Sequence, residues 1–205
     1  MTTSTTSQLL ARIRRHLWEL LKAHGFRQRG DRFCRDQDQV VQLVEIQRSR
    51  EGTAQRLRIA VNLGVASIHL LEIRGRRNDG RQRVESCHWR RRLTPTVNGD
   101  DHWWTAIDLV SAEQVGDAIC ESLLSNGLAQ LQGVASETLL CEAWERGSGP
   151  GLTEAERLVF LSELRQILGP PEAASQAMKK VRSEAAKRPS AILLERIAEA
   201  DRRES

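Results

Sequence analysis

Asp100, Asp101 and His102 place two carboxylates and an imidazole next to one another in the sequence. Side chains of these types can ligate a metal ion or activate a water molecule for hydrolysis. His69 and His88 could join them if the chain folded back on itself. The spacing offers neither His-x-x-x-His nor Cys-x-x-Cys, and an exposed turn is the better explanation of the three neighbours. We therefore predict no metal site, and a hydrolase that uses Asp101 and His102 is the third of three functional hypotheses.

Cys87 precedes His88 directly, which places a thiol next to a base. Neighbouring residues on a strand point to opposite faces, so we expect these two side chains to point apart. The sequence contains no Gly-x-Ser-x-Gly motif, no phosphate-binding loop and no dinucleotide fingerprint. We therefore predict no catalytic residue and no cofactor, and we favour a protein that is not an enzyme.

Arginine is concentrated in residues 74–92, and this region carries the strongest nucleic-acid signal of the chain. Such a basic segment could neutralise phosphates. No helix-turn-helix, zinc finger or RNP motif accompanies it, and Glu72, Asp79 and Glu85 dilute the positive charge. A solvated loop is the favoured alternative. The basic residues are Arg74, Arg76, Arg77, Arg81, Arg83, Arg90, Arg91 and Arg92.

Two adjacent tryptophans, Trp103 and Trp104, are notable because aromatic residues make up only 4% of the chain and Tyr is absent. An exposed pair could form a platform on which a base or a sugar stacks. Adjacent residues of a strand point to opposite faces, however, so each tryptophan could instead anchor one layer of the core. The core role is favoured, and both residues remain candidate ligand contacts.

The 205 residues, with 40% hydrophobic content, suffice for a substantial core and argue against disorder. Residues 1–100 carry 20 basic and 10 acidic side chains, whereas residues 101–205 carry 11 and 17. The halves therefore have net charges of +10 and −6. This asymmetry suits either an anionic partner for the first half or attraction between the two halves. We favour the second explanation because it needs no partner.

The location of the protein is predicted from three features. The N-terminal region has no apolar run long enough for a secretory signal, and no segment approaches the ~20 apolar residues of a membrane span. The cysteines are scattered, as expected for reduced thiols. We expect a soluble, cytoplasmic protein with no membrane partner. The four cysteines are Cys34, Cys87, Cys120 and Cys141.

An antiparallel sheet is expected to position these residues. The clearest strand covers residues 56–63, where aliphatic side chains alternate with polar or small ones, the period of a sheet buried on one face. Two strands are predicted before it in the sequence, over residues 31–35 and Val40–Arg48, and the three strands are expected to pair as a meander. Further strands are predicted over Ile68–Ile73 and residues 82–93. The alternating aliphatic residues are Leu57, Ile59, Val61 and Leu63.

Amphipathic helices account for most of the remaining chain. The first is predicted to follow Ser7 as N-cap and to end at Gly25. A capping-box pattern at Ser111 and Gln114 predicts the start of another. Further helices are expected over residues 136–146, 153–168 and 172–187, and beyond Ser190.

Residues 147–151, Gly-Ser-Gly-Pro-Gly, form the only obvious linker. They predict a boundary between an α+β domain over residues 7–146 and a C-terminal helical appendage over residues 152–205. The apolar faces of the appendage helices suit an unknown protein partner or a second copy of the chain.

Residues 25–64, together with residues 88–93 and 101–104, resemble the bacterial family called domain of unknown function 4304 (DUF4304). Its members have a helix, a glycine- and arginine-containing segment, a strand that ends near a glutamine, an Asn-Leu-Gly at the end of the next strand, and a tryptophan pair before a helix. The resemblance covers about residues 7–133. It implies an α+β domain, and it brings no catalytic residue with it.

These patterns predict an α+β fold, with helices packed on one face of an antiparallel, twisted sheet and a C-terminal helical appendage. The first functional hypothesis is a non-enzymatic module that binds a protein or a ligand, or self-associates through the C-terminal helices. Nucleic-acid binding through residues 74–92 is the alternative. The predicted ligand contacts are Arg90, Arg91, Arg92, Trp103 and Trp104.

Overall fold

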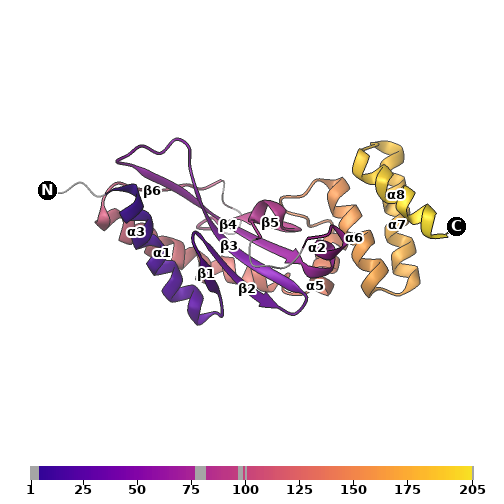
Figure 1. Ribbon diagram of the computed structural model, residues 1–205, viewed down its shortest axis with the longest axis horizontal. Helices are drawn as coiled ribbons and strands as arrows, with labels where there is room; N and C mark the ends of the chain where they lie inside the picture. The colour runs from indigo at the N-terminus through magenta and orange to yellow at the C-terminus, as the bar shows by residue number, and fades with distance from the viewer. Residues whose placement is uncertain (1–4, 77–81, 97–98, 100, 205) are drawn as a thin grey trace.

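The computed structural model describes residues 5–76, 82–96, 99 and 101–204. It has the predicted α+β architecture, an open antiparallel sheet with helices around it (Figure 1). The strands pair in the order β1-β2-β3-β4-β5, and β6 pairs with the other end of β4. The strands are β1 (Arg27–Arg29), β2 (Arg32–Gln37), β3 (Val40–Arg48), β4 (Leu57–Ser67), β5 (Trp89–Arg92) and β6 (Trp104–Ala106).

One face of the sheet, called the first face here, carries the alternating aliphatic side chains of β4. All four of the predicted residues are at most 4% exposed, so the predicted alternation is confirmed. They join one apolar cluster with the buried residues of α1 (Thr6–Ala23) and α3 (Leu109–Ser122). Burial of this face supplies much of the driving force for folding. The residues are Leu57, Ile59, Val61 and Leu63.

The opposite, second face is covered only in part. At one end, Val41, Leu43 and Ala66 form a separate small apolar cluster. A short helix, α2 (Ile68–Ile73), and a 3-10 turn, η1 (Val84–Ser86), contribute apolar residues to this cluster. Further along the same strands the second face becomes polar. The residues that α2, η1 and the following position contribute are Leu71, Val84 and Cys87.

The strand predicted over Ile68–Ile73 is wrong, because this segment is the helix α2. Ser67 caps the helix, and its hydroxyl accepts a hydrogen bond of 3.0 Å from the backbone N–H of Leu70. A six-residue segment with four apolar residues is too short for its periodicity to separate a strand from a buried helix, and only the cap distinguishes them.

The strand predicted over residues 82–93 is present only at β5. The backbone N–H of Val84 donates to Oε2 of Glu45 at 2.9 Å, and Arg32 donates to the carbonyl of Gln82 at 2.8 Å. Glu45 and Arg32 belong to the second face of the sheet. Their hydrogen bonds hold residues 82–84 over this face, so these residues do not pair with the edge of a strand. Gly64 permits the close approach, because a Cβ there would lie 2.7 Å from Sγ of Cys87.

Two predicted N-caps lie at other residues. The first helix is capped by Thr5 instead of Ser7, and α3 is capped by Asp108, with Ser111 as its partner in the capping box. The helix predicted over residues 153–168 begins with a capping box formed by Thr153 and Glu156. The helices between α3 and the linker are η2 (a π-helix, Leu123–Gly127), α4 (Leu128–Gln132) and α5 (Glu137–Glu145).

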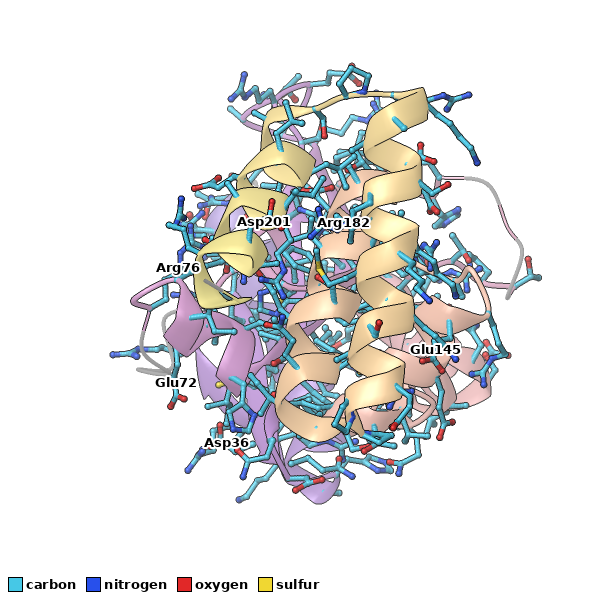
Figure 2. All side chains as sticks on the ribbon, turned by 90° about the vertical axis from the view of Figure 1, so that its right-hand side faces the viewer. Asp36, Glu72, Arg76, Glu145, Arg182 and Asp201 are labelled. Atoms are coloured by element: carbon cyan, nitrogen blue, oxygen red, sulfur yellow. The ribbon has the colours of Figure 1, made fainter. Side chains whose placement is uncertain are left out.

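Three helices follow the linker and gather at one end of the elongated molecule, α6 (Glu154–Leu168), α7 (Pro171–Lys187) and α8 (Ala191–Glu204) (Figure 1). Figure 2 shows α7 and α8 from this end, with Arg182 and Asp201 between them, and an ion pair of 2.5 Å joins these two side chains. Buried residues of all three helices belong to the same apolar cluster as the first face. The division of the chain at residues 147–151 remains a prediction.

In the part of the chain that the structure describes, no helix is both long enough and apolar enough to cross a membrane.

Candidate functional site

A pocket of about 360 Å³ opens on the polar part of the second face. Its wall combines β3, β4 and β5 with η1, the segment before β6 and the linker. Most of these residues carry polar or charged side chains. The lining residues are Gln47, Asn62, Val84, Glu85, Arg90, Arg91, Arg92, Asp101 and Gly151.

Arg92 is held in this pocket by three different contacts. Its Nε lies 3.3 Å from Oδ1 of Asp101, and its Nη2 donates to Oε1 of Gln47 at 3.3 Å. Its guanidinium also lies 4.8 Å from the ring centre of Trp103, a distance suited to a cation–π contact. The same amide oxygen of Gln47 accepts a hydrogen bond of 2.9 Å from Asn62. These contacts therefore fix the position of the Arg92 guanidinium in the pocket wall.

Arg90 lies two residues earlier on the same side of β5, and its hydrogen bonds go to uncharged oxygens. Its Nη1 donates to the backbone carbonyl of Glu85 at 2.7 Å, and its Nη2 donates to the carbonyl of Gly151. Gly151 is required here, because its φ is +74° and a Cβ would lie 2.7 Å from Cβ of Arg90. The backbone N–H of Arg90 donates to the carbonyl of Pro150 at 3.1 Å. The linker is thus joined to β5.

Two guanidinium nitrogens in the pocket wall, Nε of Arg90 and Nη1 of Arg92, are buried and have no hydrogen-bond partner within the protein. Among the described residues, Arg90 also has no ion-pair partner, since both of its bonded oxygens are backbone carbonyls. A buried donor on a charged group costs free energy until an acceptor reaches it, about 1–3 kcal/mol or more. The pocket wall therefore offers both positive charge and unused donors.

The two predicted tryptophans differ in position. Trp104 is 5% exposed and belongs to the core cluster, as the favoured interpretation predicted. Trp103 lies at the second face, where the guanidinium of Arg58 is 5.0 Å and that of Arg92 4.8 Å from its ring centre. Its indole N–H donates to Asp101 at 3.2 Å. The ring is therefore used to position arginines, and this limits its use as a stacking platform.

The described arginines of the predicted basic region are divided between different surroundings. Arg74 donates to Glu163 on α6 at 2.8 Å and lies over the ring of Phe160, so it is part of the contact with the C-terminal helices. Arg91 lines the pocket together with its two neighbours on β5. Arg76 and Arg83 are exposed, whereas Arg77 and Arg81 lie outside the described residues.

Among the described residues, the carboxylate and imidazole groups considered for metal binding or hydrolysis are not brought together. Asp101 pairs with Arg92, and the ring of His102 packs edge-on against Trp104 at 4.6 Å between centres. His69 and His88 contact other elements, described below, and Asp100 lies outside the described residues.

A second polar cluster joins the end of β4 to α5. Glu137 is 2% exposed, and its Oε1 accepts from the hydroxyl of Ser67 at 2.5 Å and from the backbone N–H of His69 at 3.2 Å. Its Oε2 lies 2.6 Å from Nδ1 of His69. The residue types are those of a catalytic triad, but the hydroxyl donates to the carboxylate and caps α2 instead of facing the imidazole. The cluster therefore holds α2 against α5.

Cys87 and His88 point to different surroundings, as predicted for neighbours on an extended chain. Burial raises the pKa of the Cys87 thiol, which lies in the small second-face cluster. His88 accepts a hydrogen bond of 3.0 Å at Nδ1 from the backbone N–H of Ser67 and packs edge-on against Phe160. Burial, aided by nearby arginines, lowers the pKa of His88 to about 3. Neither group is prepared for nucleophilic catalysis.

Sequence reasoning identified the arginines of the pocket but missed Gln47, Asn62 and Gly151. Gln47 and Asn62 belong to the glutamine and Asn-Leu-Gly features of the family resemblance, but those features do not indicate a pocket. Alternation does place Gln47 and Asn62 on the second face, because they sit out of phase with the buried aliphatic residues. Nothing in the sequence indicates that the linker returns to β5.

A family model described as domain of unknown function (DUF4304) matches residues 17–132, more than half of the chain. The chain therefore belongs to this family, and the predicted resemblance is confirmed. No curated protein and no solved structure matches the sequence. The strands and arginines of the pocket lie inside the matched region, whereas Gly151 lies outside it.

Proposed function

We propose that this member of the DUF4304 family is a non-enzymatic ligand-binding module, and that its ligand occupies the pocket on the second face of the sheet. One observation carries the proposal. Hydrogen-bonding groups from several separate segments converge on a pocket of about 360 Å³. This volume lies within the range of about 300–1,000 Å³ that is typical of small-molecule sites.

The placement of the potentially reactive groups supports a binding role over catalysis. In the described part of the chain, the hydroxyl of Ser67 is committed to Glu137, and the thiol of Cys87 is buried away from His88. Catalysis by a nucleophile needs an adjacent base within hydrogen-bond reach. The pocket wall holds guanidinium and amide groups, which bind ligands without taking part in proton transfer at neutral pH, and two exposed carboxylates, of which Asp101 pairs with Arg92. Binding is therefore the simplest function for this surface.

The interaction hypothesis for the C-terminal helices remains a prediction. Three large apolar side chains of these helices are exposed, Ile167 at 45%, Leu168 at 41% and Leu194 at 53%. Single exposed apolar residues are common on protein surfaces, and they do not mark an interface by themselves. The pocket therefore has more support as the functional site than the C-terminal helices have.

The cellular location of the protein is also a proposal. We propose that the module acts in the cytoplasm, which its four free thiols favour, because extracellular proteins of this size commonly pair their cysteines.

A screen of small-molecule fragments by protein-observed NMR tests the binding function. Fragments are expected to shift the amide signals of Asn62, Glu85 and Gly151 together. An Asn62→Phe variant, which fills the pocket, should lose these shifts. A Gln28→Phe variant is the matched control, because Gln28 is an exposed strand residue outside the pocket. Fragments that shift no pocket signal, or that shift both variants equally, would overturn the proposal.

A further inference from the structure

We infer that the ligand of this pocket is a small molecule with an oxyanion, either a phosphate or a carboxylate group, that binds between Arg90 and Arg92. This inference rests on the proposed function, because it names the chemical class of the ligand for the same site.

The charge of the pocket wall is the first reason. Arg90 and Arg92 lie on the pocket side of β5, and two acidic residues, Glu85 and Asp101, share the lining. Asp101 compensates Arg92, but it is 62% exposed and therefore partly screened by solvent. Arg90 has no carboxylate partner among the described residues and donates only to backbone carbonyls. An anion in the pocket would supply the missing counter-charge.

Several buried or partly buried arginines elsewhere in the molecule pair with a carboxylate of the chain. Arg74 has Glu163 at 2.8 Å, Arg157 has Glu154 at 2.5 Å, and Arg165 has Glu145 at 2.8 Å. Each of these cations reaches a carboxylate of its own chain. Arg35 also donates only to uncharged oxygens, but Arg90 differs from it and from these three because it lies at the wall of a pocket with a buried Nε that has no partner. We attribute the difference to a negative group that is not part of the chain.

The unused donors define how the anion would be bound. Nε of Arg90 and Nη1 of Arg92 each lack a partner within the protein, and both arginines come from the same side of β5. Their atoms are covered in this conformation, so the flexible side chains must turn a guanidinium edge toward the pocket for an oxyanion to be reached. A phosphate or a carboxylate has several acceptor oxygens and can bind both groups at once.

The rest of the lining favours a small organic anion over a nucleic acid. Gln47 and Asn62 present amide groups beside the arginines, and Glu85 adds an acidic residue that would repel a long polyanion. Arg74 is committed to Glu163, which removes one of the described arginines from any basic track that could follow a phosphate backbone.

Titration with inorganic phosphate and, separately, with acetate tests the inference. Both are added at constant ionic strength, and binding is followed by amide NMR signals of the full chain. We expect phosphate, acetate or both to shift the pocket signals saturably, and an Arg90→Gln, Arg92→Gln double variant to bind about tenfold or more weakly. Arg76→Gln, an exposed arginine outside the pocket, is the matched control and should bind as the wild type does.

The two arms separate the possible sources of the oxyanion, because tighter binding of phosphate indicates a phosphorylated ligand and tighter binding of acetate a carboxylic acid. Anions that shift nothing, while neutral fragments still bind the pocket, would overturn the inference and leave the proposed function in place. Equal weakening by Arg76→Gln would show that general surface charge is responsible, and would also overturn it. Binding of a single-stranded oligonucleotide without any binding of the small anions would favour the nucleic-acid hypothesis instead.

The folding of the double variant is checked by the dispersion of its amide spectrum. If it fails to fold, the single Arg92→Gln variant replaces it. Arg92 contributes no backbone-directed hydrogen bond to the fold, and its contacts are with Asp101, Gln47 and Trp103. Retained phosphate and acetate affinity in that folded variant would count against the inference.

Discussion

The two faces of strands β3, β4 and β5 have different roles in this protein. On the first face of β4, every second residue from Leu57 to Val65 is buried in the main apolar cluster. On the second face, Gln47 and Asn62 line a pocket beside two arginines with unused donors. The first face stabilises the fold. On the second face, α2 and η1 cover one end, and the other end is available for a ligand. Alternation along a strand separates these two roles residue by residue.

Polar groups on the two faces also differ in how completely they are paired. On the first face, Gln42 is fully buried, and its side chain accepts from Arg35 at 2.8 Å and donates to the carbonyl of Leu131 at 2.8 Å. In the pocket, Arg90 and Arg92 each retain a nitrogen without a partner. Buried polar groups that serve the fold are normally satisfied by the protein itself. Nε1 of Trp144 in the main apolar cluster is also unpaired, so the second face is distinguished by the combination of unused arginine donors with a pocket.

The largest contrast is expected from adjacent residues of β4. Leu63→Ala removes a fully buried side chain from the first face and should lower the free energy of unfolding by about 2–5 kcal/mol. Asn62→Ala, its neighbour on the second face, should lower it by about 1 kcal/mol or less, because it loses only one exposed hydrogen bond. Urea unfolding of both variants measures the difference. Equal losses would contradict the division of roles between the faces.

The carboxylate at the end of the first face is expected to be structural. Glu137→Ala leaves the hydroxyl of Ser67 and the backbone N–H of His69 without their acceptor and should cost about 2–4 kcal/mol. Glu142→Ala on the same helix is the control, and it should cost about 0.5 kcal/mol or less because that side chain is 46% exposed. Thermal unfolding of both variants decides the matter. A Glu137→Ala protein as stable as its control would contradict the structural role.

The buried side chain of His88 should make the free energy of unfolding depend on pH. The pKa of His88 in the folded protein is about 3, below the ordinary value of 6.5, so between these values only the unfolded chain binds the proton. Stability contributed by the neutral ring is therefore complete above about pH 6.5 and falls as the pH decreases toward 3. Between about pH 7 and pH 5 this residue should cost about 2 kcal/mol.

A His88→Gln variant checks this pH dependence, because glutamine cannot take up the proton and its amide oxygen can still accept from the N–H of Ser67. Urea unfolding of the wild type and the variant at both pH values is compared. If both proteins lose the same stability on acidification, His88 is not the responsible group.

The smallest expected effect belongs to the pocket. Phosphate at about ten times its dissociation constant should raise the free energy of unfolding of the wild type by about 1.4 kcal/mol, since it binds only the folded protein. The Arg90→Gln, Arg92→Gln double variant should show no such increase, whereas Leu63→Ala, although less stable, should keep it. Differential scanning fluorimetry with chloride as the reference salt measures the increase. Retention of the effect in the double variant would contradict the role of the second face.

The sheet was predictable from the sequence wherever one face is apolar. Residues 56–63 alternate clearly, and β3 is rich in β-branched residues, so both strands were recognised. The helix at Ile68–Ile73 was not, because a six-residue segment with four apolar residues suits either structure and the deciding contact is a single serine cap. Residues 82–87 were assigned to a strand, because their attachment to Glu45 and Arg32 involves residues far away in the sequence.

The candidate site was predictable only as separate parts. Composition pointed to Arg90, Arg91 and Arg92, and scarcity of aromatic residues pointed to Trp103 and Trp104. Their arrangement depends on strand register, which pairs Asn62 with Arg92 and Gly64 with Arg90. The register and the return of the linker to β5 are set by contacts between distant residues, and no local pattern encodes them.

The side-chain Nε–H signals of the arginines provide the most direct measurement on the second face. In a phosphate titration at constant ionic strength, the signal of Arg90 should shift saturably, because its Nε has no partner within the protein. The signal of Arg74, which is paired with Glu163, should stay unchanged and serves as the internal reference. No shift at Arg90, or an equal shift at both arginines, would contradict the assignment of the second face to anion binding.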